Sequence, residues 1–342
     1  MKTFNALTLL CPLCRVPLDD SIATRCVCPR CARSFPIFHG IPDLRSEPDE
    51  YSGEELATLL ARFDESSLED LIRLRLSFNQ MPADVADLHL KHELVGNERG
   101  AERTEQIVRF AGDAVDFSGI ALDIGCGMGG MVHALAQRFA WAVGIDVALP
   151  DLIIAQKRCQ EAGLDNVTFI CASAEALPFA DGTFAMMNAT DVVEHVPQQR
   201  LFLSEGYRVL QPGGYFCFNS PNRYNIFGPE PHVNLWGVGF LPRAWMPAYV
   251  KLFKGMGYTG KRLLSYLELR AMLHQTLGAD KARNGTASGP SFQILGTAIR
   301  ASSARKGWKH RLAFRYPFLV DLANRFLKPF VPQYEVVVSK PR

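Results

Sequence analysis

The stretch Ile120-Ala-Leu-Asp123-Ile-Gly125-Cys-Gly127-Met-Gly129-Gly130 decides the fold class of this chain. It starts as a short apolar strand, enters a glycine-rich turn and leads into a helix. The residues that form one apolar stripe of this helix are Val132, Leu135, Ala136 and Phe139. Glycines let the backbone approach a ligand, and a helix N-terminus presents free N–H groups, so the stretch predicts a cofactor-binding turn.

Charge at the turn distinguishes two cofactor classes. The glycines that fit the dinucleotide pattern GxGxxG, which is weak evidence on its own, are Gly125, Gly127 and Gly130. Asp123 lies at the mouth of the turn, where its carboxylate would repel a pyrophosphate but attract the sulfonium and ammonium groups of S-adenosylmethionine. The turn therefore favours S-adenosylmethionine over a nicotinamide cofactor. The next predicted strand, Ala142–Ile145, ends in Asp146, whose carboxylate can accept both ribose hydroxyls.

The order of motifs over residues 120–220 resembles the class I S-adenosylmethionine-dependent methyltransferases, in particular the large type 11 group. The further motifs are the strand Val167–Ile170, the loop Ser173–Phe179, the strand Phe184–Thr190, the run Asp191-Val-Val-Glu194-His195-Val196, the helix Pro197–Leu210, the stop Gln211–Gly214 and the strand Tyr215–Asn219. The resemblance implies an α/β fold with a doubly wound, mostly parallel, seven-stranded Rossmann-like sheet. To this fold we add a small N-terminal zinc ribbon and a helical cap.

The resemblance also implies where the cofactor binds. Asp123 and the glycines would lie near the methionine moiety, Asp146 at the ribose and the turn Ser173–Glu175 at the adenine. Many relatives have Asp where this chain has Ser173, so the Ser173 side chain or the Ala174 backbone would accept the adenine amino group instead. The predicted cofactor-binding residues are Asp123, Gly125, Cys126, Gly127, Asp146, Val147, Ser173, Ala174, Glu175 and Thr190.

A second group of chemically active residues follows the fourth predicted strand. Asp191, Glu194 and His195 would share one face if this turn is helical, and we predict all three to be catalytic. The region is similar to ubiquinone-pathway O-methyltransferases and plant small-RNA 2′-hydroxyl methyltransferases, which carry Glu-x-x-Glu-His there. This similarity implies that His232 joins them around Mg²⁺, Mn²⁺ or a similar divalent ion, which would lower the pKa of a substrate hydroxyl. Many type 11 enzymes have Glu-His here without a metal, so without an ion the Glu194–His195 pair would orient the substrate or close the fold, or His195 would be the general base.

The cysteines are concentrated near the N-terminus. Five of the nine lie between Cys11 and Cys31, in the pattern Cys11-Pro-Leu-Cys14 and Cys28-Pro-Arg-Cys31. Two CxxC knuckles suit a tetrahedral zinc ion with bonds of about 2.3 Å, so we predict a zinc-ribbon domain over residues 1–45. Such a short segment cannot build a large apolar core, and the ion would supply much of its folding energy. Cys26 could replace Cys28 as a ligand, and a redox pair of thiols is the remaining alternative.

This segment resembles the zinc ribbon of small activator subunits of tRNA methyltransferases, including its tail Phe35–Leu44. A zinc knuckle also precedes the catalytic domain of a ribosomal RNA guanine methyltransferase. The resemblance implies substrate recognition, or docking to a protein partner or sister subunit. It does not imply chemistry at the ion, because four thiolates leave no open metal position.

Residues 46–118 are predicted to be a linker and a helical cap. The linker is polar at Ser46–Glu50, and apolar residues recur at helical spacing over Glu54–Leu76. A second helix is predicted over Arg99–Phe110. These helices would cover the sheet, form a lid over a substrate pocket, or do both.

Residues 119–342 are predicted to be the methyltransferase domain, with an insertion over 223–262. The aromatic residues of the insertion would contact an acceptor or fill a small core of their own. A helix over Ser265–Gly278, a loop over Asp280–Pro290 and a last strand over Tyr334–Val338 follow. The basic, aromatic segment Arg300–Lys328 would contact a phosphate-bearing, lipid-linked or nucleic-acid acceptor, or form a solvated face.

Composition narrows the function. The chain has 342 residues, of which 48% are hydrophobic and 21% charged, and a net charge of +2. These values exclude wholesale disorder and give no overall polyelectrolyte signature for nucleic acid. No run of about 18 apolar residues suggests a transmembrane segment, and the apolar run near the N-terminus is too short for a secretory signal, so we expect a cytoplasmic protein.

We therefore predict an S-adenosylmethionine-dependent methyltransferase that acts on a hydroxyl of a specialised small molecule. One alternative is an RNA methyltransferase that recognises its substrate through the zinc ribbon. Another is a non-catalytic scaffold that binds the cofactor and docks partners. The intact Asp123, Gly125, Gly127 and Asp146 argue against loss of cofactor binding.

Overall fold

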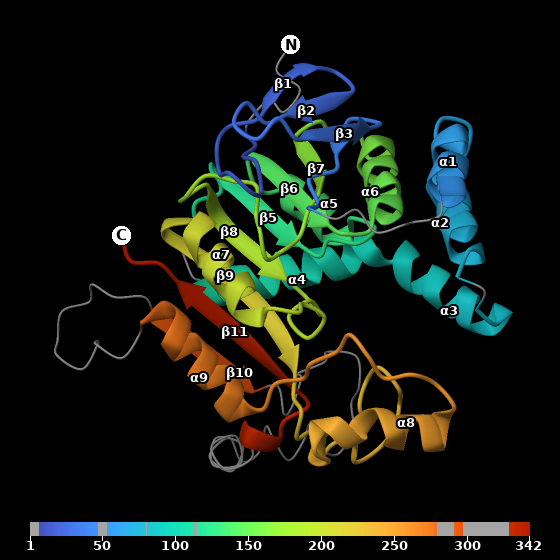
Figure 1. Cartoon of the computed structure of the whole chain (residues 1–342), viewed down its shortest axis with the longest axis vertical. Helices are drawn as coiled ribbons and strands as arrows, with labels where there is room; N and C mark the ends of the chain where they lie inside the picture. Colours follow the sequence, from blue (N-terminus) through green and yellow to red (C-terminus); the bar gives the residue numbers. More distant parts are fainter. Residues whose placement is uncertain (1–6, 47–52, 80, 112–114, 279–290, 297–327) are drawn as a thin grey trace. The chain divides into compact units, whose positions relative to one another are not determined.

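The structure is a computed structural model that describes residues 7–46, 53–79, 81–111, 115–278, 291–296 and 328–342 (Figure 1). The chain divides into two compact units. The first contains residues 1–189, 201–216 and 339–342, and the second contains residues 190–200 and 217–338. None of the helices in the described ranges has the length and apolarity that a bilayer crossing requires. The predicted loop over 280–290 and nearly all of the basic segment over 300–328 lie outside the described residues.

A seven-stranded sheet with the order β10-β11-β9-β8-β5-β6-β7 confirms the predicted α/β class. Its strands are β5 (Ile120–Ile124), β6 (Trp141–Asp146), β7 (Val167–Cys171), β8 (Phe184–Ala189), β9 (Leu210–Pro221), β10 (Ser291–Gly296) and β11 (Gln333–Ser339). Strand β5 is parallel to both β6 and β8, and β6 is parallel to β7. Strands β5 and β8 are almost entirely buried, as their apolar sequences require. Strand β9 begins at Leu210, so the predicted stop over 211–214 lies within this strand.

The helices α5 (Gly130–Ala136), α6 (Leu149–Glu161) and α7 (Gln199–Val209) connect these strands. The predicted helical segment over 54–76 is two helices, α1 (Gly53–Arg62) and α2 (Leu68–Ser77), because Ser67 caps α2 through a capping box with Asp70. Both helices pack on α6, where Arg75 forms salt bridges of 2.9 Å with Glu55 and 2.8 Å with Asp151. In the first unit, α1 and α2 therefore cover α6.

Two further helices, α3 (Ala83–Leu94) and α4 (Gly96–Ala111), complete the cap. The sequence indicated α4 but not α3. Helix α4 approaches α5 so closely that a Cβ atom at Gly100 would lie 2.3 Å from the carbonyl oxygen of Gly130. The buried Arg158 supports this junction, because its guanidinium donates to the carbonyl oxygens of Met128 (2.7 Å) and Glu93 (2.9 Å). The cap thus contacts the end of the glycine-rich turn.

The N-terminal segment forms a four-stranded sheet with the order β1-β2-β3-β4. Its strands are β1 (Asp19–Ile22), β2 (Arg25–Val27), β3 (Ser34–Phe38) and β4 (Ile41–Pro42), and neighbouring strands are antiparallel. The tail after β4 continues along β7, where Asp43 forms a parallel bridge with Cys171 and the Leu44 amide donates to the Cys171 carbonyl at 2.7 Å. This small sheet therefore docks on the edge of the large one in the same chain.

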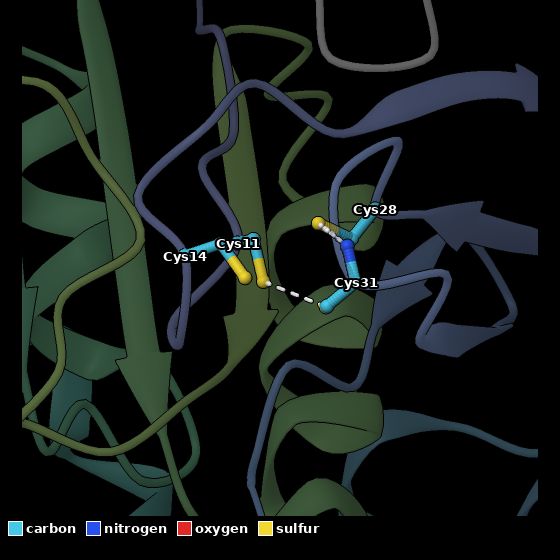
Figure 2. A group of neighbouring side chains, drawn as sticks. All are labelled: Cys11, Cys14, Cys28 and Cys31. Carbon is cyan, nitrogen blue, oxygen red and sulfur yellow. Dashed lines mark hydrogen bonds between the residues drawn. The ribbon is translucent and has the colours of Figure 1, made fainter.

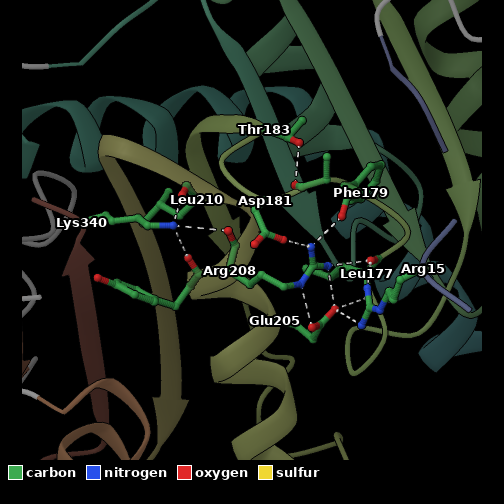
Figure 3. A network of polar contacts seen from close by, with 11 residues as sticks. Arg15, Leu177, Phe179, Asp181, Thr183, Glu205, Arg208, Leu210 and Lys340 are labelled. Carbon is green, nitrogen blue, oxygen red and sulfur yellow. Dashed lines mark hydrogen bonds and ion pairs between the residues drawn. The ribbon is translucent and has the colours of Figure 1, made fainter. Parts of the chain in front are cut away.

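A network of ion pairs and hydrogen bonds gives the N-terminal segment a second contact with the first unit, in addition to the pairing with β7 (Figure 3). Arg15 of the N-terminal segment donates to the carbonyl oxygen of Leu177 and to the carboxylate of Glu205, each at 2.7 Å. Arg208 also donates to Glu205, at 2.9 Å, and the neighbouring Lys340 donates to the Leu210 carbonyl at 2.7 Å. These contacts join the N-terminal segment, the loop after β7, helix α7 and the C-terminus.

The second unit contains the insertion over 223–262, which has a small core of its own. This core is formed by Val233, Val238, Met246, Val250 and Tyr258. Two of the aromatic residues of the insertion stay outside it, since Trp236 is 58% exposed and Phe240 is 52% exposed. The insertion includes α8 (Met246–Lys254) and two short 3-10 turns, Val238–Phe240 and Arg243–Trp245. The predicted helix over 265–278 is α9 (Tyr266–Leu277), and Lys328–Phe330 forms a third 3-10 turn.

Candidate functional site

The four cysteines of the two knuckles converge, as their spacing predicts (Figure 2). The sulfur atoms of Cys11, Cys14, Cys28 and Cys31 all lie within 4.8 Å of one another, and Cys11 Sγ lies 3.9 Å from Cys31 Sγ. A tetrahedral zinc site with bonds of about 2.3 Å has sulfur–sulfur edges of about 3.8 Å. The residues therefore fit a zinc ion.

The structure also separates the alternative ligands. Cys26 lies in β2, buried, and is not part of the group, whereas Cys28 is. Burial acts to raise the pKa of Cys28, but hydrogen bonds from the backbone N–H groups of Cys31 and Arg30 outweigh it and lower this pKa to about 7. Amide-to-sulfur hydrogen bonds of this kind, here 3.4 Å from the Cys31 nitrogen, stabilise a thiolate.

The glycine-rich turn has the backbone that its sequence demands. Gly125, Gly127 and Gly129 all have positive φ, at 69°, 48° and 81°, where most other residues are strained. Gly129 caps α5, and the amides of Gly125 and Cys126 both donate to the carbonyl of Ile145 in β6. The turn is thereby held between β5 and β6, and the Cys126 side chain is buried.

A buried carboxylate lies at the start of this turn. Asp123 is 3% exposed, and its Oδ1 accepts a hydrogen bond of 2.7 Å from the Asn188 side chain of β8. Asn188 in turn accepts from Arg103 Nε of α4 at 3.1 Å. Burial raises the pKa of Asp123 to about 7; Asn188 and Arg103 lower it, and Asp146 raises it. Sequence reasoning missed Asn188 and Arg103, although Arg103 lies one helical turn before the inward-facing Ile107.

Asp146 ends β6 beside the same turn. Its two carboxylate oxygens accept from the backbone amides of Gly127, at 2.8 Å, and Ala148, at 2.9 Å. Burial raises its pKa despite these hydrogen bonds. The next residue, Val147, presents a 44% exposed side chain, while its carbonyl accepts from Arg45 of the N-terminal segment at 2.9 Å. Arg45 also pairs with the buried Asp43 at 2.7 Å.

The predicted adenine turn follows β7. Ser173 Oγ accepts from the Glu175 amide at 3.2 Å, and the side chains of Ser173, Ala174 and Glu175 are all half-buried. Asp123, the glycines, Asp146 and this turn all belong to the first unit. Thr190 opens the second unit, and its side chain is exposed.

In the second unit, Glu194, His195 and His232 form a cluster. Their potential ligand atoms all lie within 4.8 Å of one another, with His232 Nε2 3.9 Å from Glu194 Oε1 and the two imidazole rings 5.0 Å apart. Glu194 is 2% exposed, and neither of its carboxylate oxygens has a hydrogen-bond partner on another described residue. A buried carboxylate without a donor is costly, and a cation between these groups would satisfy it. The residues therefore fit a divalent ion.

The protonation of this cluster follows from its burial. Burial raises the pKa of Glu194 to about 7, and the nearby Asp191 raises it further while His232 lowers it. Burial is the main cause that lowers the pKa of His195, and the neighbouring His232 and Lys261 lower it further. A neutral imidazole is the form that binds a metal or accepts a proton.

The structure does not bring Asp191 into this group, contrary to the prediction from spacing. The turn after β8 is not a helix, and Asp191 itself has a positive φ of 56°. Its amide donates to Asn219 Oδ1 at 2.5 Å, and its carboxylate accepts from Asn219 at 3.0 Å and from Gln333 at 3.3 Å. Asp191 thus fastens its loop to β9 and β11 and is not one of the three clustered side chains.

Comparisons with known proteins agree with the fold. A family model described as "Methyltransferase domain" matches residues 122–218. The chain is 33% identical over 140 residues to the ubiquinone biosynthesis O-methyltransferase of Paracidovorax citrulli, covering 39% of this chain and 56% of that protein. It is 38% identical over 104 residues to the protein of the same name from Methylococcus capsulatus, covering 30% and 44%. The chain thus spans about half the length of these curated relatives.

Two solved structures are similar at lower identity. One is the phosphoethanolamine N-methyltransferase 2 of Haemonchus contortus in complex with S-adenosyl-L-methionine, with 17% identity, a TM-score of 0.44, and coverage of 69% of this chain and 51% of that chain. The other is the YcgJ protein of Bacillus subtilis, with 18% identity, a TM-score of 0.43, and coverage of 72% and 99%. Residues 122–218, which include the glycine turn described above, therefore form a methyltransferase domain of the class I S-adenosylmethionine-dependent type.

Proposed function

We propose that this chain transfers a methyl group from S-adenosylmethionine to a hydroxyl of a small molecule, with the assistance of a divalent ion. The observation that carries this proposal is the buried Glu194 carboxylate, which has no hydrogen-bond partner on another described residue and lies within 4.8 Å of a nitrogen of each of two imidazoles. O-Methylation is further supported by the partial similarity to proteins named ubiquinone biosynthesis O-methyltransferases.

The first unit provides the cofactor residues. S-Adenosylmethionine supplies the methyl group from its sulfonium. Asp123 binds the ammonium of its methionine moiety, and Arg103, bonded to Asn188 beside Asp123, binds the carboxylate. Asp146 accepts from the ribose hydroxyls, and the exposed Val147 side chain packs on the adenine. The remaining predicted contacts are Gly125, Cys126 and Gly127 at the methionine moiety, Ser173, Ala174 and Glu175 at the adenine edge, and Thr190 at the start of the next loop.

The second unit provides the residues that act on the acceptor. Glu194, His195 and His232 hold the divalent ion, which when bound lowers the pKa of an acceptor hydroxyl. His195 is the most exposed of the three, and its lowered pKa keeps its imidazole neutral, which is the form that binds an ion. The loop is held in place by Gln199, which donates to the carbonyls of Val193 (2.7 Å) and Arg262 (2.8 Å), and by the Asp191–Asn219 pair. Asp191 is therefore a positioning residue.

The four-cysteine cluster holds a structural zinc ion. Because all four ligand positions are thiolates, this ion takes no part in methyl transfer. Its role is to fold the N-terminal segment, whose tail and Arg15 contact the loops after β6 and β7.

The experiment combines cofactor binding with a methyl-transfer screen on the full chain. Isothermal titration with S-adenosylmethionine comes first, followed by transfer of labelled methyl groups to phenols, sugars and RNA. Dialysis against a chelator, followed by one equivalent of zinc per chain, which the four thiolates bind first, separates the thiolate site from the divalent site. We expect turnover to stay low until a second divalent ion is added, and Glu194→Gln to lower turnover at least about 100-fold.

Glu268→Gln is the matched control, since this carboxylate caps α9 and pairs with Arg243 in the same unit. If zinc-restored protein, Glu194→Gln and His232→Ala all kept near-normal rates, ion assistance would be wrong and His195 would be the base. Methylation of RNA without methylation of any small hydroxyl compound would overturn the acceptor class.

A further inference from the structure

Glu230 is a buried carboxylate that the proposed chemistry does not use. It is 7% exposed, and its Oε2 accepts from the backbone amides of His232 and Val233, each at 2.9 Å. Its Oε1 lies 2.6 Å from His232 Nδ1 and accepts from the Tyr258 hydroxyl at 3.3 Å. The carboxylate is therefore held by two backbone amides and a buried phenol in a single orientation toward one ring nitrogen.

This contact fixes the tautomer of His232. An ionised carboxylate accepts hydrogen bonds and donates none, so the proton of the neutral imidazole must be on Nδ1. Nε2 then carries a lone pair. The structure directs this Nε2 toward the Glu194 carboxylate, at 3.9 Å from Oε1, and places the ring edge-on to that of His195. Two acceptors that face each other in a buried space repel unless the carboxylate takes up a proton or a cation lies between them, and above the raised pKa of Glu194 only the cation removes this repulsion.

We propose that Glu230 is a positioning residue: it accepts from Nδ1 of His232 and so holds the Nε2 lone pair facing Glu194 and His195, where the three side chains would hold a transition-metal ion. The ion itself rests on the proposed function above. A carboxylate that accepts from the far nitrogen of a ligating histidine fixes the ring and raises its basicity. Two imidazoles and one carboxylate favour a first-row transition ion over Mg²⁺, which prefers oxygen ligands. Tyr258 supports the arrangement by orienting Glu230.

Two measurements on the full-length protein test this inference. The first is the tautomer of His232 in metal-free protein, read from nitrogen-15 NMR in alkaline buffer, with His232→Gln for assignment. The second is the affinity for Co²⁺ and for Mg²⁺, measured with the thiolate site already filled with zinc. The variants are Glu230→Gln, which keeps the shape but not the charge, and Tyr258→Phe, which removes only the hydroxyl. Glu268→Gln is the control carboxylate.

We expect wild-type His232 to carry its proton on Nδ1 and to bind Co²⁺ more tightly than Mg²⁺. Glu230→Gln should mix the tautomers and weaken Co²⁺ binding about 10- to 100-fold, Tyr258→Phe should give a smaller loss, and Glu268→Gln should change neither. Circular dichroism and thermal melting check that the variants fold. If Glu230→Gln does not fold, the smaller loss of Co²⁺ affinity expected for Tyr258→Phe still tests the inference.

A wild-type proton on Nε2, or a tautomer that does not respond to Glu230→Gln, would overturn the positioning role. Tighter binding of Mg²⁺ than of Co²⁺ would overturn the ion class. If the tautomer depended on Glu230 but no divalent ion bound, the ion assistance of the proposed function would be wrong while the positioning of His232 by Glu230 would stand.

Discussion

The buried Asp123 gives cofactor binding a defined dependence on pH. Burial raises its pKa to about 7, the Asn188 and Arg103 side chains only partly offset this, and Asp146 adds to it. A protonated Asp123 cannot form an ion pair with the ammonium group of S-adenosylmethionine. The free protein must therefore release this proton before the cofactor binds in the proposed way, and affinity should rise with pH up to about 7.

The magnitude follows from the fraction of ionised Asp123. About half is ionised at pH 7, about one part in eleven at pH 6 and about one part in a hundred at pH 5, so each pH unit below 7 weakens binding up to about tenfold, or about 1.4 kcal/mol. Stability of the free protein changes in the opposite sense. Because the folded-state pKa is raised from 3.8, this group favours folding at acid pH, and that contribution, about 4 kcal/mol, is lost as pH rises through 7.

The assay is isothermal titration of the full chain with S-adenosylmethionine from pH 5 to pH 7 at constant ionic strength. The range ends at pH 7 because the amino group of the cofactor begins to titrate above it. Asp123→Asn should abolish most of the pH dependence of the affinity. Asp146→Asn should weaken binding but keep a pH dependence, moved to lower pH because Asp146 helps to raise the pKa of Asp123. A flat wild-type profile, or an Asp123→Asn profile as steep as the wild type, would refute the assignment of the ammonium to Asp123.

Three further predictions concern stability. Arg45→Ala leaves the buried Asp43 without its guanidinium partner and should lower the free energy of urea unfolding by about 3–5 kcal/mol. Arg33→Ala, at an exposed side chain of the same segment, should lower it by less than about 1 kcal/mol, and equal losses would contradict the buried-pair argument. Gly100→Ala forces α4 away from α5 and should cost at least about 2 kcal/mol, while Gly53→Ala, with open space around it in α1, should be neutral or stabilising by thermal melting. Removal of zinc by a chelator should expose the amides of the N-terminal sheet to hydrogen exchange, and added zinc should restore their protection. Protection that survives chelation would mean that this sheet folds without the ion.

The fold was predictable from sequence because its strongest signals are local. The turn after β5 needs positive φ values, which glycine adopts with little strain. Apolar runs such as Phe184–Ala189 form strands that are buried on both faces. Helix α3 escaped prediction because it carries a single buried residue, Leu90, and so shows no apolar stripe. The break between α1 and α2 depends on the Ser67 cap, which interrupts a pattern of apolar residues that otherwise continues.

The candidate site was predictable only in part. Spacing along the chain suggested one face for Asp191, Glu194 and His195, but that inference assumes a helix. Asp191, just after β8, instead has a positive φ, and its carboxylate pairs with Asn219. His232 reaches Glu194 across a loop, which only the resemblance to known families indicated. Glu230 was missed because its role depends on a contact with the side chain two residues later, for which the sequence offers no periodic signal.

The docking of the N-terminal tail on β7 has a consequence for any attempt to work with the catalytic part alone. A protein that began at residue 46 would present the outer strand of its large sheet with the Cys171 carbonyl unpaired. Exposed strand edges recruit strands from other molecules, so such a truncated chain should self-associate. The cysteine-rich segment therefore covers this edge strand, and its removal should increase aggregation.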